Sequence, residues 1–259
     1  MGTPRRFFMS LHRTHFLYLC YKSSSVRYIS FYILILLLCG QTVLSQDDIK
    51  EYSVIDSLYR EDQVYIGVTF NLLSNKPDGV SQNGLSGSMQ LGFIRDMPIN
   101  KRRNKAFGVG LGVSVDTFNQ DLLIAEEADG DTTMFAEISE DIDVDKNRFS
   151  FYTLEFPIQY RWRTSTPTKY AFWRIHTGVQ FGYIFRFKST FISEGVEVTQ
   201  TDVPELNKLQ YGLTFAFGYG AFNFQAYYGI NTLFNDDAII NGQNVNLQVV
   251  RLGLQFYFL

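Results

Sequence analysis

The residues of this sequence with the greatest capacity for chemistry are charged or titratable side chains that alternate with apolar ones. Glu155 and Arg161 precede a polar turn, and Arg174 and His176 follow it. His176 is the only histidine beyond residue 15, so acid–base or Ser–His chemistry in this part of the chain depends on it. Charged groups in a polar interior can instead neutralise one another. The choice between these two roles depends on the element that carries the residues.

A second candidate site is the acidic stretch 117–145, which contains ten acidic residues and neither Lys nor Arg. Asp141, Asp143 and Asp145 have the spacing of the first ligands of a calcium loop. Lys146, however, stands where such a loop needs glycine, and Tyr152 stands where it needs a bidentate glutamate. We therefore predict solvated, mobile loop charge in the connection 117–146, with no metal site and no cofactor.

The element around Glu155 and His176 is predicted to be a β-hairpin, because apolar and polar residues alternate with period two on both sides of the turn. The apolar positions are Tyr152, Leu154, Phe156, Ile158, Tyr160 and Trp162, then Trp173, Ile175, Val179, Phe181, Tyr183 and Phe185. Alternation sustained over this length, with aromatic residues on the apolar face, is typical of a membrane-spanning hairpin.

The same alternation recurs along the chain and predicts eight strands. They cover 63–73, 85–95, 106–116, 152–163, 173–186, 209–218, 221–233 and 250–258. Each is long enough to cross a bilayer as a tilted strand, and an even number suits a bacterial barrel. The glycines of the third strand, Gly108, Gly110 and Gly112, open no helix and are predicted to make room inside. The predicted fold is all-β, an eight-stranded antiparallel transmembrane β-barrel of the outer-membrane type.

Connection lengths orient the predicted barrel. The connections after odd-numbered strands are long, whereas 96–105, 164–170 and 218–221 are short. Outer-membrane barrels have long external loops and short periplasmic turns. We therefore predict localisation in the outer membrane as a multi-pass barrel with the N-terminus in the periplasm.

The first 45 residues are predicted to be a secretory signal peptide. Five basic residues precede the apolar run 31–38, which is too short for a membrane-spanning helix. We predict cleavage between Ser45 and Gln46, and the unusually long basic lead fits a start at Met9 or later. Residues 46–62 then form a periplasmic lead-in, and 63–259 form the barrel. Both cysteines, Cys20 and Cys39, lie in the leader.

Composition limits the classes of molecule that the mature chain is expected to contact. Removing the leader's five basic residues from 23 leaves 18 against 26 acidic ones, a net charge of −8. This charge argues against nucleic acid as a partner. The 24 Phe and 16 Tyr favour a barrel wall in contact with outer-membrane lipid. The oligomeric state has no signature in the sequence.

In an eight-stranded barrel the interior is just wide enough for side chains to fill it. We interpret the inward charged residues as an ion-paired plug, with a proton-linked or gated path as the alternative; catalysis through His176 is disfavoured, and no catalytic residue is predicted. The predicted lumen charge network comprises Glu155, Arg161, Arg174, His176, Arg186 and Arg251.

One segment carries a family resemblance. The runs Leu154-Glu155-Phe156-Pro157, Arg161-Trp162-Arg163-Thr164-Ser165-Thr166-Pro167 and Phe172-Trp173-Arg174 resemble the PorT family of Bacteroidetes barrel proteins. The resemblance covers about a tenth of the chain. It implies a non-enzymatic component or accessory of the type IX secretion system, which is associated with gliding motility, and other secretion-system proteins as partners.

The resemblance leaves two functional hypotheses. In the first, a periplasmic turn docks other secretion components, and its candidate residues are Arg163, Thr164, Ser165, Pro167 and Lys169. In the second, the protein is a stand-alone structural or adhesin-like barrel, or a porin-family protein, that works through its acidic outer loop. The first depends on the turns and the second on the loops, so the two can be separated by mutation.

Overall fold

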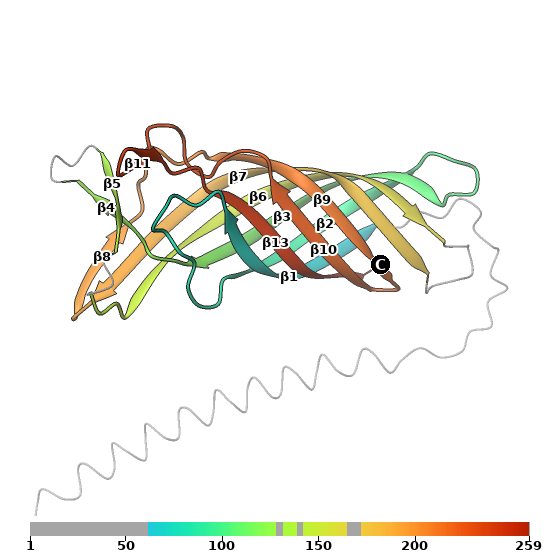
Figure 1. Ribbon diagram of the computed structural model, residues 1–259. Coiled ribbons are helices and arrows are strands. Elements are labelled where there is room, and N and C mark those ends of the chain that lie inside the picture. Colours follow the sequence, from blue (N-terminus) through green and yellow to red (C-terminus); the bar gives the residue numbers. More distant parts are fainter. Residues whose placement is uncertain (1–61, 128–131, 139–141, 165–171, 259) are drawn as a thin grey trace, which may run out of the picture. The chain divides into compact units, whose positions relative to one another are not determined.

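Eight long strands close into an antiparallel barrel in the computed structural model, which describes residues 62–127, 132–138, 142–164 and 172–258 (Figure 1). The predicted fold class is thereby confirmed. The barrel strands are β1 (Gln63–Ser74), β2 (Gly87–Pro98), β3 (Lys105–Asn119), β6 (Lys146–Arg163), β7 (Trp173–Ser193), β9 (Leu209–Tyr219), β10 (Phe222–Gly229) and β13 (Gln248–Phe258).

Each barrel strand pairs with its neighbours along the chain, and β1 pairs with β13 to close the barrel. Closure pairs the two outer edges of the sheet with each other, which matters in hydrocarbon, where an unsatisfied backbone group costs several kcal/mol. Within the part of the chain that the structure describes, no helix is long and apolar enough to cross a membrane.

The two faces of the wall have the polarity expected of a membrane barrel. Outward apolar side chains are exposed, as Val68 (50%) and Leu213 (52%) illustrate, whereas inward Glu155 and Arg161 are buried. A water-soluble barrel would bury its apolar side chains and expose its charged ones. The outward face is therefore suited to lipid and the inward face is polar.

Aromatic contacts lie near both ends of the apolar wall. At the end where β13 terminates, the ring centres of Trp173 and Phe217 are 5.2 Å apart, and Phe222 lies 5.3 Å from Phe256. Nearer the other end, Tyr152 lies 6.1 Å from Phe185. Amphipathic and aromatic side chains of this kind favour the two membrane–water interfaces.

The two ends of the barrel differ in their connections. At one end, here called the turn end, the strands are joined by 99–104, 164–172 and 220–221. The opposite end, the loop end, carries 75–86, 120–145, 194–208 and 230–247. Five short strands lie in these loops: β4 (Leu122–Glu126), β5 (Thr133–Glu137), β8 (Val196–Gln200), β11 (Ile239–Ile240) and β12 (Gln243–Asn244). In Figure 1, β4, β5, β8 and β11 are labelled at the loop end.

The connection 117–146 is more ordered than predicted. β3 continues to Asn119, β4 pairs with β5 as a hairpin, and β6 begins at Lys146. The expectation of a mobile loop is therefore wrong for these described residues. Its apolar residues Leu122, Ile124 and Phe135 are buried, and burial of each such side chain contributes about 1.5–3 kcal/mol.

These loops share one hydrophobic core, and together they form a folded cap over the loop end. The rings of Phe118 and Phe149 stack at 5.1 Å, and Phe135 meets Phe234 edge-on at 5.2 Å. The cluster joins strand ends to residues of all four loops: Leu73, Val80, Phe118, Leu122, Ile124, Phe135, Phe149, Phe151, Ile184, Phe187, Val203, Leu206, Tyr227, Leu233, Phe234, Ala238, Ile240, Val245, Leu247 and Val249.

The predicted leader 1–45 and nearly all of the lead-in 46–62 lie outside the described residues.

Candidate functional site

The turn end of the interior is occupied by an ion-pair cluster centred on Asp96. One carboxylate oxygen accepts from Nη1 of Arg161 at 3.1 Å, and the other accepts from Nη1 of Arg163 at 2.7 Å. All three side chains are almost fully buried. Arg161 also donates to the side-chain oxygen of Gln63, and Arg163 Nε donates to the carbonyl of Arg103 at 3.1 Å. The cluster thus ties β1, β2 and β6 together.

His176 lies beside this cluster and is 2% exposed. Its Nε2 accepts from Arg161 Nε at 3.4 Å, and its Nδ1 lies 3.2 Å from the hydroxyl of Tyr257. The Tyr257 hydroxyl in turn donates to Gln255 at 2.8 Å. These contacts fit a neutral imidazole with its proton on Nδ1. Both ring nitrogens face structural partners, so the geometry offers no nucleophile–base pair at this histidine.

A second ion-pair cluster lies farther along the interior, around Arg251. Its Nε is 3.1 Å from Asp116, and its Nη1 donates to Glu155 at 2.7 Å. Asp116 also accepts from Asn71 and from Ser114, each at 3.1 Å. One guanidinium group therefore bridges two buried carboxylates, and neutral side chains donate further hydrogen bonds to Asp116. Among the described residues, Glu155 Oε2 and Arg251 Nε have no hydrogen-bond partner. Pairing of opposite charges offsets part of the cost of burying them.

Glycines of β2 and β3 make room for these large inward side chains. A Cβ at Gly112 or Gly92 would overlap the ring or hydroxyl of Tyr65, and a Cβ at Gly108 would lie 2.7 Å from the side chain of Arg161. The predicted role of the β3 glycines therefore agrees with their surroundings. They let the interior hold Tyr65 and Arg161 without widening the barrel.

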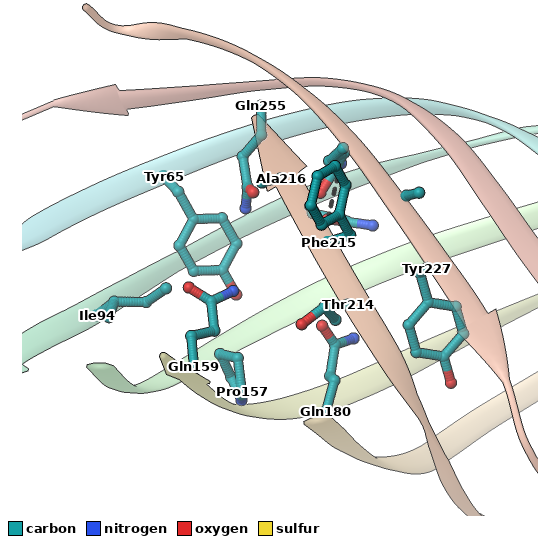
Figure 2. Close-up of a pocket in the computed structure, with 13 residues that line it drawn as sticks. Tyr65, Ile94, Pro157, Gln159, Gln180, Thr214, Phe215, Ala216, Tyr227 and Gln255 are labelled. Carbon is teal, nitrogen blue, oxygen red and sulfur yellow. Dashed lines mark hydrogen bonds between the residues drawn. The ribbon is translucent and has the colours of Figure 1, made fainter. Parts of the chain in front are cut away.

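Little free volume remains inside. Figure 2 shows an interior cavity lined by residues that include Tyr65, Gln159 and Gln180, and its volume is about 10 Å³. A second interior cavity beside Arg251 is equally small. Each is close to the minimum needed to hold a water molecule. This geometry supports an ion-paired plug and gives no support to a wide diffusion pore.

Arg186, which we predicted to face the lumen, instead faces outward and is exposed. The reason is a β-bulge: Tyr152 pairs with Arg186, but Thr153 pairs with Ile184, so Phe185 is an extra residue on β7. A bulge places two successive side chains on one face and reverses the alternation beyond it. The inward position therefore passes to Phe187. The Arg186 guanidinium lies 5.9 Å from the ring centre of Tyr152.

Arg174 is buried, as predicted, and lies at the turn end. It donates to the carbonyl of Gly220, and its guanidinium carbon lies 4.3 Å from the ring centre of Phe172. The structure thus places Glu155, Arg161, Arg174, His176 and Arg251 inside the barrel. It brings them together as two carboxylate clusters and one turn-end contact, with Arg186 outside.

The predicted docking turn needs a correction at Arg163. This side chain is 1% exposed and pairs with Asp96, because the inward phase of β6 continues to its last residue. Thr164 exchanges hydrogen bonds with Trp173: the Trp173 N–H donates to its hydroxyl and its own N–H donates to the Trp173 carbonyl, both at 3.0 Å. Ser165, Pro167 and Lys169 lie outside the described residues.

Sequence reasoning missed the two aspartates that organise the interior. Asp96 was assigned to a connection, although it continues the inward series Ser88, Gln90, Gly92 of β2. Asp116 ends the predicted strand 106–116 in phase with the inward Gly108, Gly110 and Gly112, but it is not part of the predicted charge network. The signal available for both was the phase of the alternation, since an Asp on the inward face of a narrow barrel requires a cationic partner.

Metal binding finds no support in the described residues, where no group of three His, Cys, Asp or Glu side chains is placed to hold an ion. The predicted calcium-like series cannot be followed in full, because Asp141 lies outside the described ranges.

Comparison with known proteins defines the class. Residues 45–235 match the family model described as outer membrane protein beta-barrel domain, and the chain belongs to this family. Together with the fold, this makes the protein an outer-membrane β-barrel.

Solved structures similar to this chain include Ail, the attachment invasion locus protein of Yersinia pestis. The alignment has 15% identity, covers 78% of this chain and 100% of Ail, and has a TM-score of 0.36. A second structure of Ail, in complex with the heparin analogue sucrose octasulfate, has 16% identity, the same coverage and a TM-score of 0.32. No curated protein matches the chain.

Proposed function

We propose that this outer-membrane barrel is a non-enzymatic protein that binds other proteins through its loop-end cap. The observation that carries the proposal is the shared hydrophobic core of the cap. Loops that only connect strands have no need of a common core, whereas a recognition surface must hold its contact residues in a fixed arrangement. The filled interior adds support, because it favours neither transport nor access to His176.

The proposed orientation places the loop end outside the cell and the N-terminus in the periplasm. Long loops on the external side and short periplasmic turns are the usual arrangement of such barrels. The described residues contain no cysteine, so single cysteines report orientation cleanly. We expect Asp236→Cys, in the cap, to react with a membrane-impermeant maleimide on intact cells. Arg102→Cys, at the turn end, should react only after the outer membrane is permeabilised; the reverse pattern would overturn the orientation.

A role as an accessory of type IX secretion is the second candidate, and the observation that favours it is the resemblance of 154–174 to the PorT family. Several residues of that segment have structural roles: Glu155 pairs with Arg251, Arg161 and Arg163 pair with Asp96, and Trp173 stacks on Phe217. The resemblance therefore does not by itself mark a docking surface. Exposed turn-end residues such as Lys101, Arg102 and Lys105 are better candidates for periplasmic contacts.

One experiment tests both candidates. A strain lacking the gene is complemented with the native chain, with a variant in which a short Gly-Ser linker replaces 122–137, or with K101E/R102E/K105E. Secreted cargo, surface motility and adhesion are measured, and heat-modifiable gel mobility verifies that each barrel is folded. Among the complemented strains, the cap hypothesis expects only the one with the linker variant to show the surface defect of the deletion strain. The secretion hypothesis expects the deletion strain and the turn-end variant to lose export; normal export in the deletion strain would remove it.

A further inference from the structure

The barrel wall has a gap between β7 and β9 at the start of the cap. The last pair of these strands is Tyr183 with Leu209, and the N–H of Ile184 donates to the carbonyl of Lys208 at 2.7 Å. β7 next pairs on this side with β8, at Ser189 opposite Gln200. Among the described residues, β6 still pairs with one edge of β7 between these two points, but no strand pairs with the edge that faces β9 and β8. The Phe185 bulge lies within this gap.

At this gap, β7 and the segment 201–208 line a groove of about 350 Å³. Its apolar side is formed by Ile184, Phe187, Val203 and Leu206, which belong to the buried core of the cap. Its polar side is formed by Thr201, Asp202, Arg186 and Lys208. Phe185, which is 56% exposed, lines the groove from the outer wall. The groove thus combines apolar surface with two cationic side chains.

The cations of the groove are not neutralised by neighbouring acids. Arg186 and Lys208 are exposed, and neither forms an ion pair with another described residue. Asp202, the one carboxylate of the groove, lies farther from both than an ion pair requires. Lys188, two residues beyond Arg186, is exposed on the same face. In a chain with a net charge of −3, this concentration of positive charge is a local feature.

The position of the groove suits the boundary between hydrocarbon and headgroups. From the groove toward the barrel, the outward residues Phe185, Tyr183 and Leu209 are apolar or aromatic and well exposed. From the groove toward the cap, the outward residues of β7 are Arg186 and Lys188. Aromatic side chains followed by Lys and Arg mark a membrane interface, where cations attract anionic headgroups.

We propose that this groove binds a phosphate-bearing membrane lipid from the leaflet at the loop end. The headgroup phosphate lies between Arg186 and Lys208, and an acyl chain follows Phe185 and Leu209 down the outer wall. Arg186 presents a planar set of donors suited to phosphate, and its contact with Tyr152 restricts its position. This site is separate from protein binding by the cap, so either proposal can fail alone.

The test uses native mass spectrometry of the folded protein in a neutral detergent. Bisphosphorylated lipid A, its dephosphorylated form and inorganic phosphate serve as separate probes. We expect the native protein to retain the bisphosphorylated lipid in preference to the dephosphorylated one, and inorganic phosphate not to displace it. R186Q/K208Q should weaken binding about 30-fold and K208Q alone about fivefold. Asp202→Asn should strengthen binding, because it removes a negative charge from the groove.

The matched control is K101Q/K105Q, which removes two exposed positive charges at the turn end and should leave binding unchanged. Heat-modifiable mobility verifies the folding of every variant, and K208Q gives the decisive value if the double variant does not fold. Equal binding by the native protein and the groove variants would overturn the proposal, as would an equal loss in the control. Displacement by inorganic phosphate would show a free-anion site and would overturn the assignment to a lipid.

Discussion

Individual charges in the interior are matched to individual partners. Asp96 serves Arg161 and Arg163, whereas Arg251 bridges Asp116 and Glu155. Removing one partner from a buried pair leaves the other charge uncompensated, which costs more than the intact pair contributes. The contribution of these clusters is therefore best tested by measuring the free energy of unfolding of variants that lack one partner.

Asp96→Asn should lower the free energy of unfolding by about 3–5 kcal/mol, because two buried guanidinium groups lose their shared carboxylate. Urea unfolding in lipid vesicles, followed by heat-modifiable gel mobility, measures the change. Asp236→Asn, on the exposed surface of the cap, is the control and should have an unchanged midpoint. Equal midpoints for the two variants would show that the cluster contributes little.

Gly112→Ala should destabilise the barrel by about 1–3 kcal/mol, since the new methyl group would overlap Tyr65. Tyr65→Ala removes that obstacle, so the effect of Gly112→Ala should be smaller in the Tyr65→Ala background. Unfolding midpoints of the two single variants and the double variant give the coupling. Strict additivity would mean that the two residues do not share space as described.

At the scale of elements, one extra residue in β7 separates the lipid-facing barrel from the cap. Below the bulge, inward positions of the barrel are mainly polar or glycine. Above it, Phe149, Phe151 and Phe187 enter the hydrophobic core of the cap. The bulge reverses the phase so that Phe187 turns inward while Arg186 stays in contact with the exterior.

Deletion of Phe185 should be tolerated, because regular alternation would then keep Ile184 and Phe187 inward and Arg186 outward. Deletion of Val179, in the regular part of the same strand, should prevent folding, since a one-residue shift reverses the faces of the residues beyond it. Refolding yield, scored by heat-modifiable mobility, distinguishes the two. A folded Val179 deletion together with an unfolded Phe185 deletion would contradict this account of the bulge.

At the scale of the molecule, the barrel has an interior packed with side chains and carries the folded cap at its loop end. Interior cavities of about 10 Å³ leave no room for hydrated ions to pass. In planar bilayers the protein should therefore show no steady conductance above that of the lipid alone. A porin of known conductance, reconstituted in the same way, is the positive control. Reproducible ohmic steps from this protein would overturn the plug interpretation.

The sequence by itself determined the number, order and facing of the barrel strands. A strand has a side-chain period of two, so apolar-out and polar-in alternation can be read from local sequence. Lipid on one side and a narrow interior on the other kept that pattern strict, and for this reason Glu155, Arg161 and His176 were placed correctly. The prediction for Arg186 was wrong for the same reason. A local pattern does not reveal a β-bulge, and the single extra residue Phe185 shifts the alternation by one position.

Only the tertiary structure decided which charges meet and what the loops do. Arg161 finds Asp96 across 65 residues, and Arg251 finds Glu155 across 96. Such pairings depend on strand register and on closure of the barrel, which no local pattern encodes. The cap has no sequence period either, since its core is assembled from short pieces of four loops. Its packing, and the lateral groove at its base, exist only once the barrel brings those pieces together.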